Sequence, residues 1–469
     1  MKIITRFAPS PTGYLHIGNI RTALYSWLFA RKNNGKFILR IENTDFKRSN
    51  NIFIKNIIKT LKWLKIDWDE GPYLQSEKLN RYNNIINIML NNGNAYKCYC
   101  SKEEFKKNKF QQNITKNNIK YNCKCRNNKT IISNNKPYTV KLHIPKNKNI
   151  TFIDTIRGKI TFKKNILEDF IIKRSNGIPT YNFCVVIDDW DMKITHVIRG
   201  EEHINNTPKQ IHIINAIKAL IPSYTHVSVI TDTLGKKISK RDNNFDILKY
   251  KEDGYLPHAI LNYILRLGWS YGNKEIFSLE EMKKLFNLKN LNKSSSIFTI
   301  KKLNWLNRYY LNKLSEKDMI NYLKKFFDKK DINVNNGPKL KDLYKIFYKR
   351  CNTLSEISNL CKIFYTNPNY NKNLVIKKYL NNNTKIILHL FLKNINTIKI
   401  WSIKNIDYIL KKILFKLNIN FKEIAMTIRL AITGRENTPP INNILYLIGK
   451  KKTTHHIKNA INFIKFNNF

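Results

Sequence analysis

The chain has 469 residues, which is enough for two to four domains and a sizeable core. Its 84 Lys and Arg residues against 33 Asp and Glu residues give a net charge of +51, which favours a polyanionic partner. Asn, Ile, Lys, Phe and Tyr have AT-rich codons and are abundant, so mutational bias could supply part of the lysine excess.

Simple features of the sequence indicate the compartment. No apolar run reaches the roughly 18 residues that span a membrane, so we expect no transmembrane segment. Residues 1–6 lead directly into a strand-like run, which argues against a signal peptide. The seven cysteines are odd in number and include one tight cluster, which argues against a disulfide framework. We therefore expect a cytoplasmic protein.

The first 75 residues alternate between strand and helix patterns. Ile3 to Phe7 is a short strand-like run, and apolar residues recur at helical spacing over Ile20 to Ala30. After the turn at residues 33–35, Ile38 to Ile41 is predicted as a strand and Ile52 to Leu64 as a helix.

Residues from about 76 to 185 are predicted to be an insertion, after which the alternation resumes. Thr195 to Ile198 is predicted as a strand and Thr207 to Leu220 as a helix, with Thr207 as its cap and Pro208 at its first position. Val227 to Ile230 is the next predicted strand. This order predicts a doubly wound parallel sheet of the Rossmann-like α/β class, with a site outside the carboxyl ends of its strands.

Beyond about residue 242 the pattern is helical. Helices are predicted over Ala259 to Leu267 and Leu279 to Leu285, and Leu, Ile and Lys recur at helical spacing from about residue 316 to the end. The Asn-rich pieces at 108–118, 369–373 and 381–383 are predicted loops. The absence of a repeat of 20 to 50 residues makes a solenoid an unfavoured alternative.

The turn between the first strand and helix contains a candidate nucleotide motif, residues 9–18 (PSPTGYLHIG). Gly18 has no Cβ, so a flat ring such as adenine could lie directly on its backbone. The helix that follows directs its N–H groups and the positive end of its dipole at the turn, where a phosphate is a natural ligand. His16 can donate a hydrogen bond to a phosphate oxygen.

A second motif, residues 235–241 (GKKISKR), follows the last predicted strand of the sheet. Lys237 and Lys240 lie three residues apart, Ser239 is a hydroxyl donor, and Gly235 gives the loop freedom to move. Such a loop could close over a triphosphate and neutralise the charge of its transition state. In so basic a chain, a solvated surface loop is the alternative reading of this segment alone.

Together, the two motifs resemble those of the class I aminoacyl-tRNA synthetases, and most closely the bacterial glutamate–tRNA ligase family. The resemblance is close from residue 1 to about 310, and residues 431–434 (AITG) and 448–450 (IGK) resemble the family's C-terminal landmarks. It implies ATP-dependent ligation of L-glutamate to the 3′ end of tRNA(Glu) through a glutamyl-adenylate, with Mg²⁺ on the phosphates. It further implies a monomer that binds glutamate, ATP and tRNA(Glu) and no membrane.

The resemblance also implies a division into domains. Residues 1–75 and 186–241 form the Rossmann-like catalytic domain, and residues 76–185 form an inserted α+β acceptor-stem or connective domain that holds the cysteine cluster. Residues 242–315 form a helical domain that contacts the tRNA stem, and residues 316–469 form an all-helical anticodon-binding domain. The helical pattern by itself would not indicate anticodon binding, which comes here from the resemblance.

The resemblance assigns roles to residues of both motifs. The catalytic group is His16, Gly18, Lys237, Ser239 and Lys240. The ATP-binding group is Pro9, His16, Gly18, Asn19 and Lys240. His16 and Lys240 would stabilise the charge that grows on the phosphates when the α-carboxylate of glutamate attacks the α-phosphorus.

An acidic amino acid needs cations for its side-chain carboxylate, and arginine suits it because its fork binds both oxygens. Arg6 and Arg199 lie at the ends of predicted strands that a parallel sheet would deliver to one crevice, and Glu42 follows a third strand, where it could pair with the substrate ammonium. The resemblance places six residues in the glutamate pocket: Arg6, Ala8, Ser10, Glu42, Tyr181 and Arg199.

Two C-x-C pairs form the cysteine cluster: Cys98 with Cys100, and Cys123 with Cys125. Four thiolates can close a tetrahedral zinc site, and we expect structural Zn²⁺ here, the alternative being four free thiols in a metal-free hairpin. Some members of the family have three cysteines and a histidine in this region. The position of that histidine is Asn127 in this chain, so Cys123 could replace the missing ligand.

Several alternatives stay in view. Glutamine–tRNA ligases usually have Pro-Glu-Pro-Asn-Gly where residues 9–13 read PSPTG, and they carry C-terminal β-barrels where this tail is helical. The paralogue that glutamylates a queuosine base lacks an anticodon domain, and small nucleotidyltransferases are far shorter. An inactive tRNA-binding scaffold is disfavoured by the intact His16, Gly18, Ser239 and Lys240. An enzyme that also charges tRNA(Gln) remains an open alternative. Asn43 stands where the family's Ile-Glu-Asp-Thr-Asp segment has its first aspartate, and the loss of this carboxylate removes no reacting group.

Overall fold

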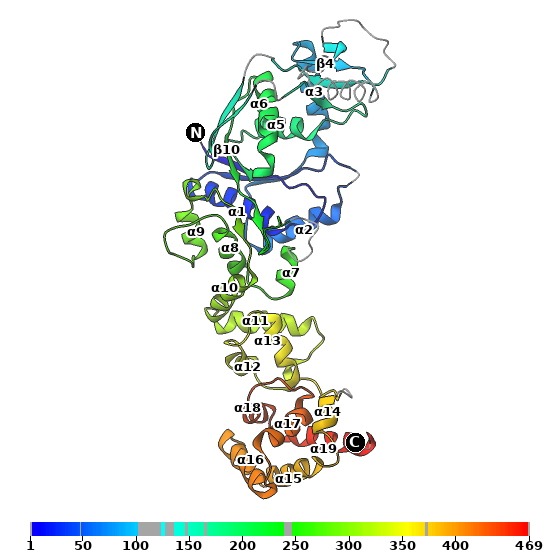
Figure 1. Ribbon diagram of the computed structural model, residues 1–469, viewed down its shortest axis with the longest axis vertical. Helices are drawn as coiled ribbons and strands as arrows, with labels where there is room; N and C mark the ends of the chain where they lie inside the picture. The colour runs from blue at the N-terminus through cyan, green and yellow to red at the C-terminus, as the bar shows by residue number, and fades with distance from the viewer. Residues whose placement is uncertain are drawn as a thin grey trace. The chain divides into compact units, whose positions relative to one another are not determined.

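The computed structural model describes residues 2–46, 48–101, 123–126, 136–145, 149–163, 167–238, 246–370 and 374–467. The chain divides into two compact units (Figure 1). The first comprises Met1–Lys251 and Pro257–Leu303, and the second comprises Glu252–Leu256 and Asn304–Phe469. Ser239, Lys240 and Asn127, to which the sequence directs attention, lie outside the described residues.

The first unit contains a parallel sheet in the order β1-β2-β3. Its strands are β1 (Ile4–Phe7), β2 (Lys36–Ile41) and β3 (Glu70–Leu74). β2 is buried over residues 37–41, as a strand covered on both faces should be. The predicted strands at residues 3–7 and 38–41 are therefore present with small shifts of their ends.

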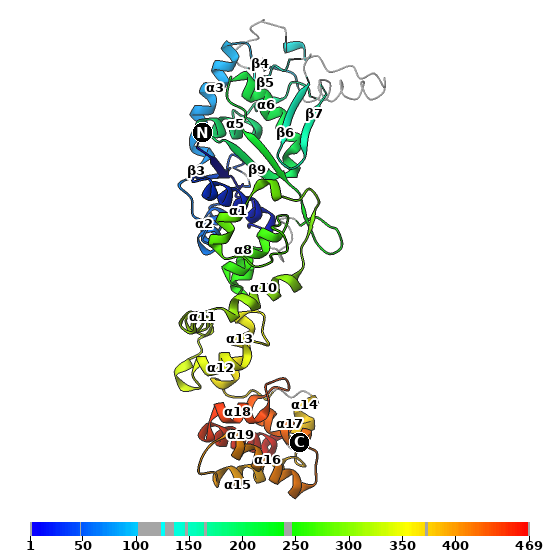
Figure 2. The ribbon, with the colours of Figure 1, turned by 90° about the vertical axis from the view of Figure 1, so that its left-hand side faces the viewer.

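A four-stranded sheet has the order β7-β6-β10-β9, in which β6, β10 and β9 are parallel and β7 is antiparallel to β6 (Figure 2). Its strands are β6 (Ile150–Asp154), β7 (Gly158–Phe162), β9 (His196–Gly200) and β10 (Ser223–Val227). Strand β6 comes from the segment that the sequence assigns to the insertion, yet it pairs directly with β10.

The two sheets meet where β1 lies beside β9. The backbone N–H of Thr195 donates to the carbonyl of Ile4 at 3.0 Å, and Arg6 Nη1 lies 3.5 Å from the carbonyl oxygen of Ile198. From β1 the chain runs outward through β2 and β3, and it later returns on the other side of β1 as β9. Such a change of direction leaves a crevice outside the carboxyl ends of the two central strands, where ligands of this class of fold bind.

Helix α1 (Ile17–Lys32) packs against β1, β2 and β9. Its buried face includes Ile20, Leu24 and Trp27, the helical spacing seen in the sequence. The helix begins three residues before the predicted start at Ile20, because His16 caps it. Three further helices of this unit are α2 (Asn51–Trp63), α8 (Pro257–Arg266) and α9 (Leu279–Leu285).

A second hydrophobic cluster of this unit joins α3 (Leu79–Asn91), α5 (Tyr181–Asp191) and α6 (Thr207–Ala216) to a small antiparallel sheet. That sheet has the order β4-β5-β8, with strands β4 (Ala95–Cys98), β5 (Thr139–Leu142) and β8 (Ile171–Lys173). The described part of the insertion is thus mixed α and β, as predicted.

Two predicted elements around the lysine loop have different bounds. Helix α6 ends at Ala216 rather than Leu220, because Lys218 adopts a left-handed φ of 58° and Ala219 N–H closes back on the Ile214 carbonyl at 3.0 Å. The strand predicted at 227–230 is wrong: β10 ends at Val227, and β11 (Ile230–Thr231) pairs instead with β12 (Ser296–Ile297).

The described part of the second unit consists of helices without strands (Figure 1). The chain enters it within α10 (Ile300–Asn312), and α7 (Ile247–Glu252) leads to its short segment 252–256. The following helices are α11 (Glu316–Asp328), α12 (Leu340–Phe347), α13 (Leu354–Cys361), α14 (Leu374–Tyr379), α15 (Lys385–Asn396), α16 (Ile403–Leu417), α17 (Phe421–Thr433), α18 (Ile441–Ile448) and α19 (Lys450–Asn467). The predicted loop at 381–383 forms the turn before α15, whereas the one at 108–118 lies outside the described residues.

Two further findings concern the cysteines and the helices. All seven cysteines are described and none forms a disulfide. Within the described ranges, no helix combines the length and the apolar character that crossing a membrane requires.

Candidate active site

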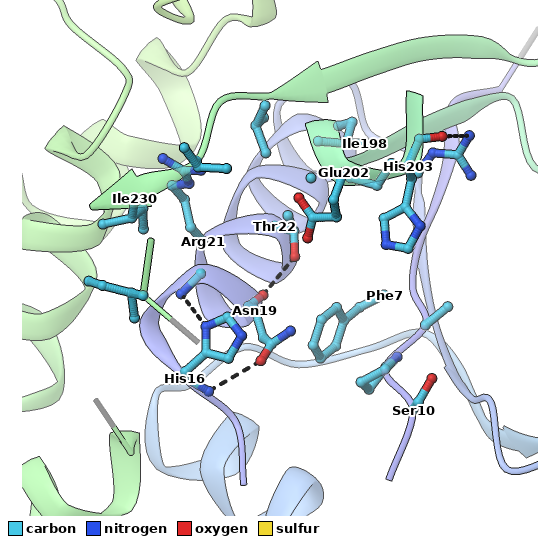
Figure 3. Close-up of a pocket in the computed structure, with 18 of the residues that line it drawn as sticks. Phe7, Ser10, His16, Asn19, Arg21, Thr22, Ile198, Glu202, His203 and Ile230 are labelled. Atoms are coloured by element: carbon cyan, nitrogen blue, oxygen red, sulfur yellow. Dashed lines mark hydrogen bonds between the residues drawn. The ribbon is translucent and has the colours of Figure 1, made fainter. Parts of the chain in front are cut away.

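A cavity of about 310 Å³ opens at the carboxyl ends of β1, β9 and β10 (Figure 3). It lies at the change of direction in the sheet, where the sequence places a site. Its lining contains every described residue that the sequence assigned to the nucleotide or to glutamate: Arg6, Ala8, Pro9, Ser10, His16, Gly18, Asn19, Glu42, Tyr181, Arg199 and Lys237. Residues more than 230 positions apart in the sequence thus share one cavity.

His16 forms the start of helix α1 at the edge of the cavity (Figure 3). Its Nδ1 accepts from the Gly18 N–H at 3.0 Å, and its own N–H donates to Asn19 Oδ1 at 3.2 Å, which closes a capping box. A Cβ on Gly18 would lie 2.8 Å from His16 Cε1, so Gly18 leaves the space that the imidazole occupies. Gly18 belongs to the helix, whereas the sequence placed it in the turn.

The described start of the lysine loop forms another edge of the cavity. Ile238 N–H donates to the Ile230 carbonyl at 3.0 Å, which anchors the loop on β11. Lys237 Nζ lies 3.6 Å from Glu202 Oε2, and both side chains are about half exposed. A half-exposed cation that lines the same cavity as His16 suits a phosphate chain, whose negative charge it can neutralise.

One wall of the cavity carries Arg6 and Glu42, which belong to a network of arginines and carboxylates. Asp189, on α5, accepts from Arg6 Nε at 3.3 Å and from Arg40 Nη1 at 2.8 Å. Arg40 also contacts Glu42 at 3.3 Å and Asp188 at 3.5 Å, and its side chain is 1% exposed. The charges of Arg6 and Arg40 are therefore compensated by acidic side chains.

The pKa values of the two carboxyls differ within this network. Burial raises the pKa of Glu42 to about 7, against the opposing charges of Arg40 and Arg6. Asp189 is also desolvated, yet Arg6 and Arg40 together lower its pKa below the ordinary value. The guanidinium of Arg40 contacts three carboxylates, and the shortest of the three contacts, at 2.8 Å, is with Asp189. Asp189 thus holds the firm negative charge, and Glu42 can gain or lose a proton near neutral pH.

A second wall of the cavity holds Arg199 and Tyr181. Arg199 is the penultimate residue of β9, is buried, and donates to Gln210 Oε1 and to Thr207 Oγ1, both at 2.8 Å. The predicted cap at Thr207 is wrong, since Asn206 occupies the cap position and the Thr207 hydroxyl accepts from Arg199 instead. Tyr181 begins α5, and its ring centroid lies 6.2 Å from that of His203.

Sequence reasoning missed several residues of this site. Arg21 lines the cavity from α1 and donates to the Leu267 carbonyl at 3.0 Å. Arg40 and Asp189 do not line the cavity but pair with its lining residues Glu42 and Arg6, and Glu202 contributes a carboxylate to its edge. Only Glu202 carries a local signal, because it follows a predicted parallel strand within a charged run.

The four cysteines of the cluster come together at one end of the first unit. Their Sγ atoms all lie within 4.8 Å of one another, with Cys98 to Cys123 at 3.4 Å, Cys100 to Cys123 at 3.6 Å and Cys100 to Cys125 at 3.7 Å. A tetrahedron of sulfurs with Zn–S bonds of about 2.3 Å has edges of about 3.8 Å, so this donor set fits a zinc ion. Arg126, next to the cluster, pairs with Asp169 at 2.8 Å and fixes the segment.

Comparison with known proteins agrees with this geometry. Residues 2–305 match the family described as tRNA synthetases class I (E and Q), catalytic domain, and residues 317–461 match the anticodon binding domain family. The chain is 51% identical over 467 residues to the glutamate–tRNA ligase of Wigglesworthia glossinidia brevipalpis, covering 100% of this chain and 99% of the relative. It is 50% identical over 465 residues to that of Buchnera aphidicola subsp. Acyrthosiphon pisum, covering 99% and 100%.

Among solved structures, a glutamate tRNA ligase from Elizabethkingia meningosepticum in complex with its amino acid superposes with a TM-score of 0.82 at 30% identity. The match covers 99% of this chain and 100% of that structure. The chain therefore combines a class I catalytic fold, with the cavity at the carboxyl ends of its parallel strands, and a helical unit that matches an anticodon binding domain. The chain belongs to the class I aminoacyl-tRNA synthetases of the glutamate and glutamine branch and, within that branch, to the glutamate–tRNA ligase family.

Proposed function

We propose that the chain activates L-glutamate with ATP and transfers it to the 3′ end of tRNA(Glu). The supporting observation is the single cavity, in which His16, Gly18 and Lys237 lie with Arg6, Glu42 and Arg199. This arrangement provides cations for a phosphate chain at one edge and groups of both signs for an amino acid at the other.

The α-carboxylate of glutamate attacks the α-phosphorus of ATP, pyrophosphate leaves, and the mixed anhydride glutamyl-adenylate forms. His16 and Lys237 face the phosphates, Pro9 and Asn19 complete the nucleotide side, and Ser239 and Lys240 act from the part of the loop outside the described residues. Mg²⁺ supplies charge neutralisation on the phosphates. The 2′-hydroxyl of the terminal adenosine then attacks the activated carbonyl, and AMP leaves.

Glutamate lies between the two walls of the cavity. Arg199 and Arg6 bind the side-chain carboxylate, Glu42 pairs with the ammonium group, and Tyr181 contributes its hydroxyl. Ala8 and Ser10 line the same side of the cavity. The walls match the charges of glutamate, which carries two carboxylates and one ammonium group.

Aminoacylation of purified tRNA(Glu) and tRNA(Gln) with labelled glutamate tests this function. Charging of tRNA(Glu) alone, lost in Lys240→Ala and kept in the loop control Lys236→Ala, is the expected result. Charging of both tRNAs would identify a non-discriminating enzyme, the second candidate. Failure to charge either tRNA, with tRNA still bound, would favour an inactive scaffold instead.

The cysteine cluster holds structural Zn²⁺ through Cys98, Cys100, Cys123 and Cys125, with Cys123 in place of the histidine that Asn127 does not supply. The mutual distances of the sulfurs support this set. Metal analysis of protein prepared with zinc present should give about one equivalent, lost in Cys123→Ser and kept in Cys184→Ser, a buried cysteine outside the cluster. Well under one equivalent in the unaltered protein would contradict the assignment.

We also propose four domains, at 1–75 with 186–241, 76–185, 242–315 and 316–469. The helical character of the second unit and the match of residues 317–461 to an anticodon binding domain support the last of them. A fragment of residues 316–469 should bind tRNA(Glu) without charging it, and a gel-shift measurement would check this.

A further inference from the structure

Arg199 is held by neutral acceptors. Its Nε lies 3.1 Å from His226 Nε2, Nη1 donates to Gln210 Oε1 at 2.8 Å, and Nη2 donates to Thr207 Oγ1 at 2.8 Å and to the His203 carbonyl at 3.5 Å. Within the described ranges, no carboxylate comes within ion-pair distance of Arg199. A buried guanidinium without a counter-charge is costly, so this wall of the cavity favours an anionic ligand.

His226 joins Arg199 to a buried carboxylate. Its Nδ1 lies 2.8 Å from Asp154 Oδ2, and the side chains of both residues are fully buried. An ionised carboxylate only accepts and a guanidinium only donates, so His226 must carry its hydrogen on Nδ1 and a lone pair on Nε2. Both neighbours therefore require the same neutral tautomer. Burial, aided by the charge of Arg199, lowers the pKa of His226 despite Asp154, which keeps the imidazole neutral.

Tyr224 fixes the plane of the same assembly. Its ring stacks on His226 with centroids 5.9 Å apart and an interplanar angle of 8°. The guanidinium carbon of Arg199 lies 5.3 Å from the centroid of the same tyrosine ring. The hydrogen bond at Nε and the contact with the tyrosine together restrict rotation of the guanidinium.

We propose that Asp154 and His226 are positioning residues for substrate selection, which hold Arg199 with its charge directed to the substrate and thereby favour glutamate over glutamine. The proposal rests on the proposed function. Glutamate supplies the missing anion, whereas the neutral carboxamide of glutamine would leave the guanidinium uncompensated. His226 never touches the substrate; it acts through Arg199 by offering a lone pair and no charge.

Asp154 also has a structural task, so His226 is the better place to test the proposal. Asp154 Oδ1 accepts from the backbone N–H groups of Ile156 at 3.0 Å and Arg157 at 2.9 Å, which orders the turn between β6 and β7. A substitution of Asp154 would disturb this turn as well as the imidazole. His226→Phe keeps a flat, somewhat larger ring on Tyr224 and removes both ring nitrogens, including the contact of Nε2 with Thr207 Oγ1 at 3.1 Å.

The first experiment compares His226→Phe and His226→Gln in aminoacylation at saturating tRNA(Glu). Loss of a hydrogen bond to a charged group should raise the KM for glutamate roughly tenfold to hundredfold in His226→Phe. The KM for ATP and kcat should stay within about threefold. Glutamine can place an amide oxygen near the position of Nε2, so His226→Gln should recover most of the affinity. The matched control is His196→Phe, on β9 with its ring against Phe29 and outside the cavity.

The second experiment adds the missing counter-charge. Gln210 is buried and lies 2.8 Å from Arg199 Nη1, so Gln210→Glu places a carboxylate there with almost no change of shape. We expect the KM for glutamate to rise more than tenfold and the preference for glutamate over glutamine to shrink. Gln210→Met, which removes the acceptor without adding charge, should have a smaller effect.

The outcomes separate the two proposals. A wild-type chain that does not charge tRNA with glutamate would overturn both. A wild-type chain that charges normally, with an unchanged glutamate KM in His226→Phe, would overturn the positioning role alone. A parallel loss of kcat and ATP affinity would reduce His226 to a structural residue. The Gln210 variants decide the question if His226→Phe does not fold. An unchanged preference for glutamate over glutamine in Gln210→Glu would contradict the idea that the neutral acceptors around Arg199 favour glutamate.

Discussion

The two walls of the cavity carry arginines in opposite electrostatic settings. Arg6 and Arg40 share Asp189, and Arg40 also meets Glu42 and Asp188. Arg199, on the second wall, is held by uncharged oxygens and a nitrogen. One wall is therefore compensated before substrate arrives, and the other becomes compensated when a carboxylate binds. The comparison teaches that the neighbours of an arginine, more than its presence, decide what it can recognise.

Substitution of Arg199 should have the largest effect on this comparison. Arg199→Lys keeps the charge but loses the fork and most of its hydrogen bonds. The loss of transition-state binding free energy should be about 2–5 kcal/mol, so kcat/KM for glutamate should fall roughly 30-fold to several thousand-fold. Steady-state aminoacylation measures the change. Arg6→Lys should cost less, because Asp189 already shares the charge of Arg6. Equal losses in both variants would contradict the difference between the walls.

Asp189→Asn should chiefly lower stability rather than selectivity. The substitution leaves two buried guanidiniums with one fewer carboxylate, and breaking such a pair costs about 3 kcal/mol. Urea unfolding followed by fluorescence would measure the loss. The control is Asp191→Asn on the same helix, where Asp191 pairs with Arg81 in a more exposed setting, so a loss below about 1 kcal/mol is expected. A similar small loss in Asp189→Asn would show that Asp188 and Glu42 suffice for Arg40.

The sequence predicted the parts of the molecule whose signals are local. Helical spacing of Ile20, Leu24 and Trp27 predicted α1, and the alternation of strands and helices predicted a crevice at the carboxyl ends of the strands. The start of α1 was missed because a histidine cap with an asparagine at the third position is an unusual capping box. The end of β10 was missed because Val227 to Ile230 is apolar throughout, whereas only tertiary pairing separates β10 from β11.

The electrostatic partners of the site lie beyond any local pattern. Asp189 is 183 residues from Arg6, and Asp154 is 72 residues from His226. In the sequence, His226 reads as an ordinary residue of a strand, and Asp189 follows Asp188 on a helix with nothing to show which of them pairs with Arg6. Their roles arise when β6 pairs with β10 and when Asp189 of α5 meets Arg40 of β2, so they could be found only from the fold.

The pH dependence of glutamate binding should give the smallest effect and the finest test of the compensated wall. Because burial raises the pKa of Glu42 to about 7, this carboxyl is ionised above pH 7 and protonated below it. Only the ionised form can pair with the ammonium group of glutamate. At pH 7 about half of the Glu42 carboxyls are ionised, and at pH 6 about a tenth are. We therefore expect kcat/KM for glutamate, which reports the enzyme before glutamate binds, to fall about fivefold from pH 7 to pH 6.

The measurement is aminoacylation between pH 6 and pH 8.5 at low glutamate and saturating ATP and tRNA. Glu42→Gln should give a lower kcat/KM that no longer varies through pH 7, since the titrating group is gone. The control is Asp69→Asn, at a carboxyl that pairs with Arg31 outside the cavity and has a lowered pKa, so the profile of the wild type should persist. If the wild-type profile is flat down to pH 6, then Arg40 and Arg6 outweigh burial, and Glu42 carries a fixed charge like Asp189.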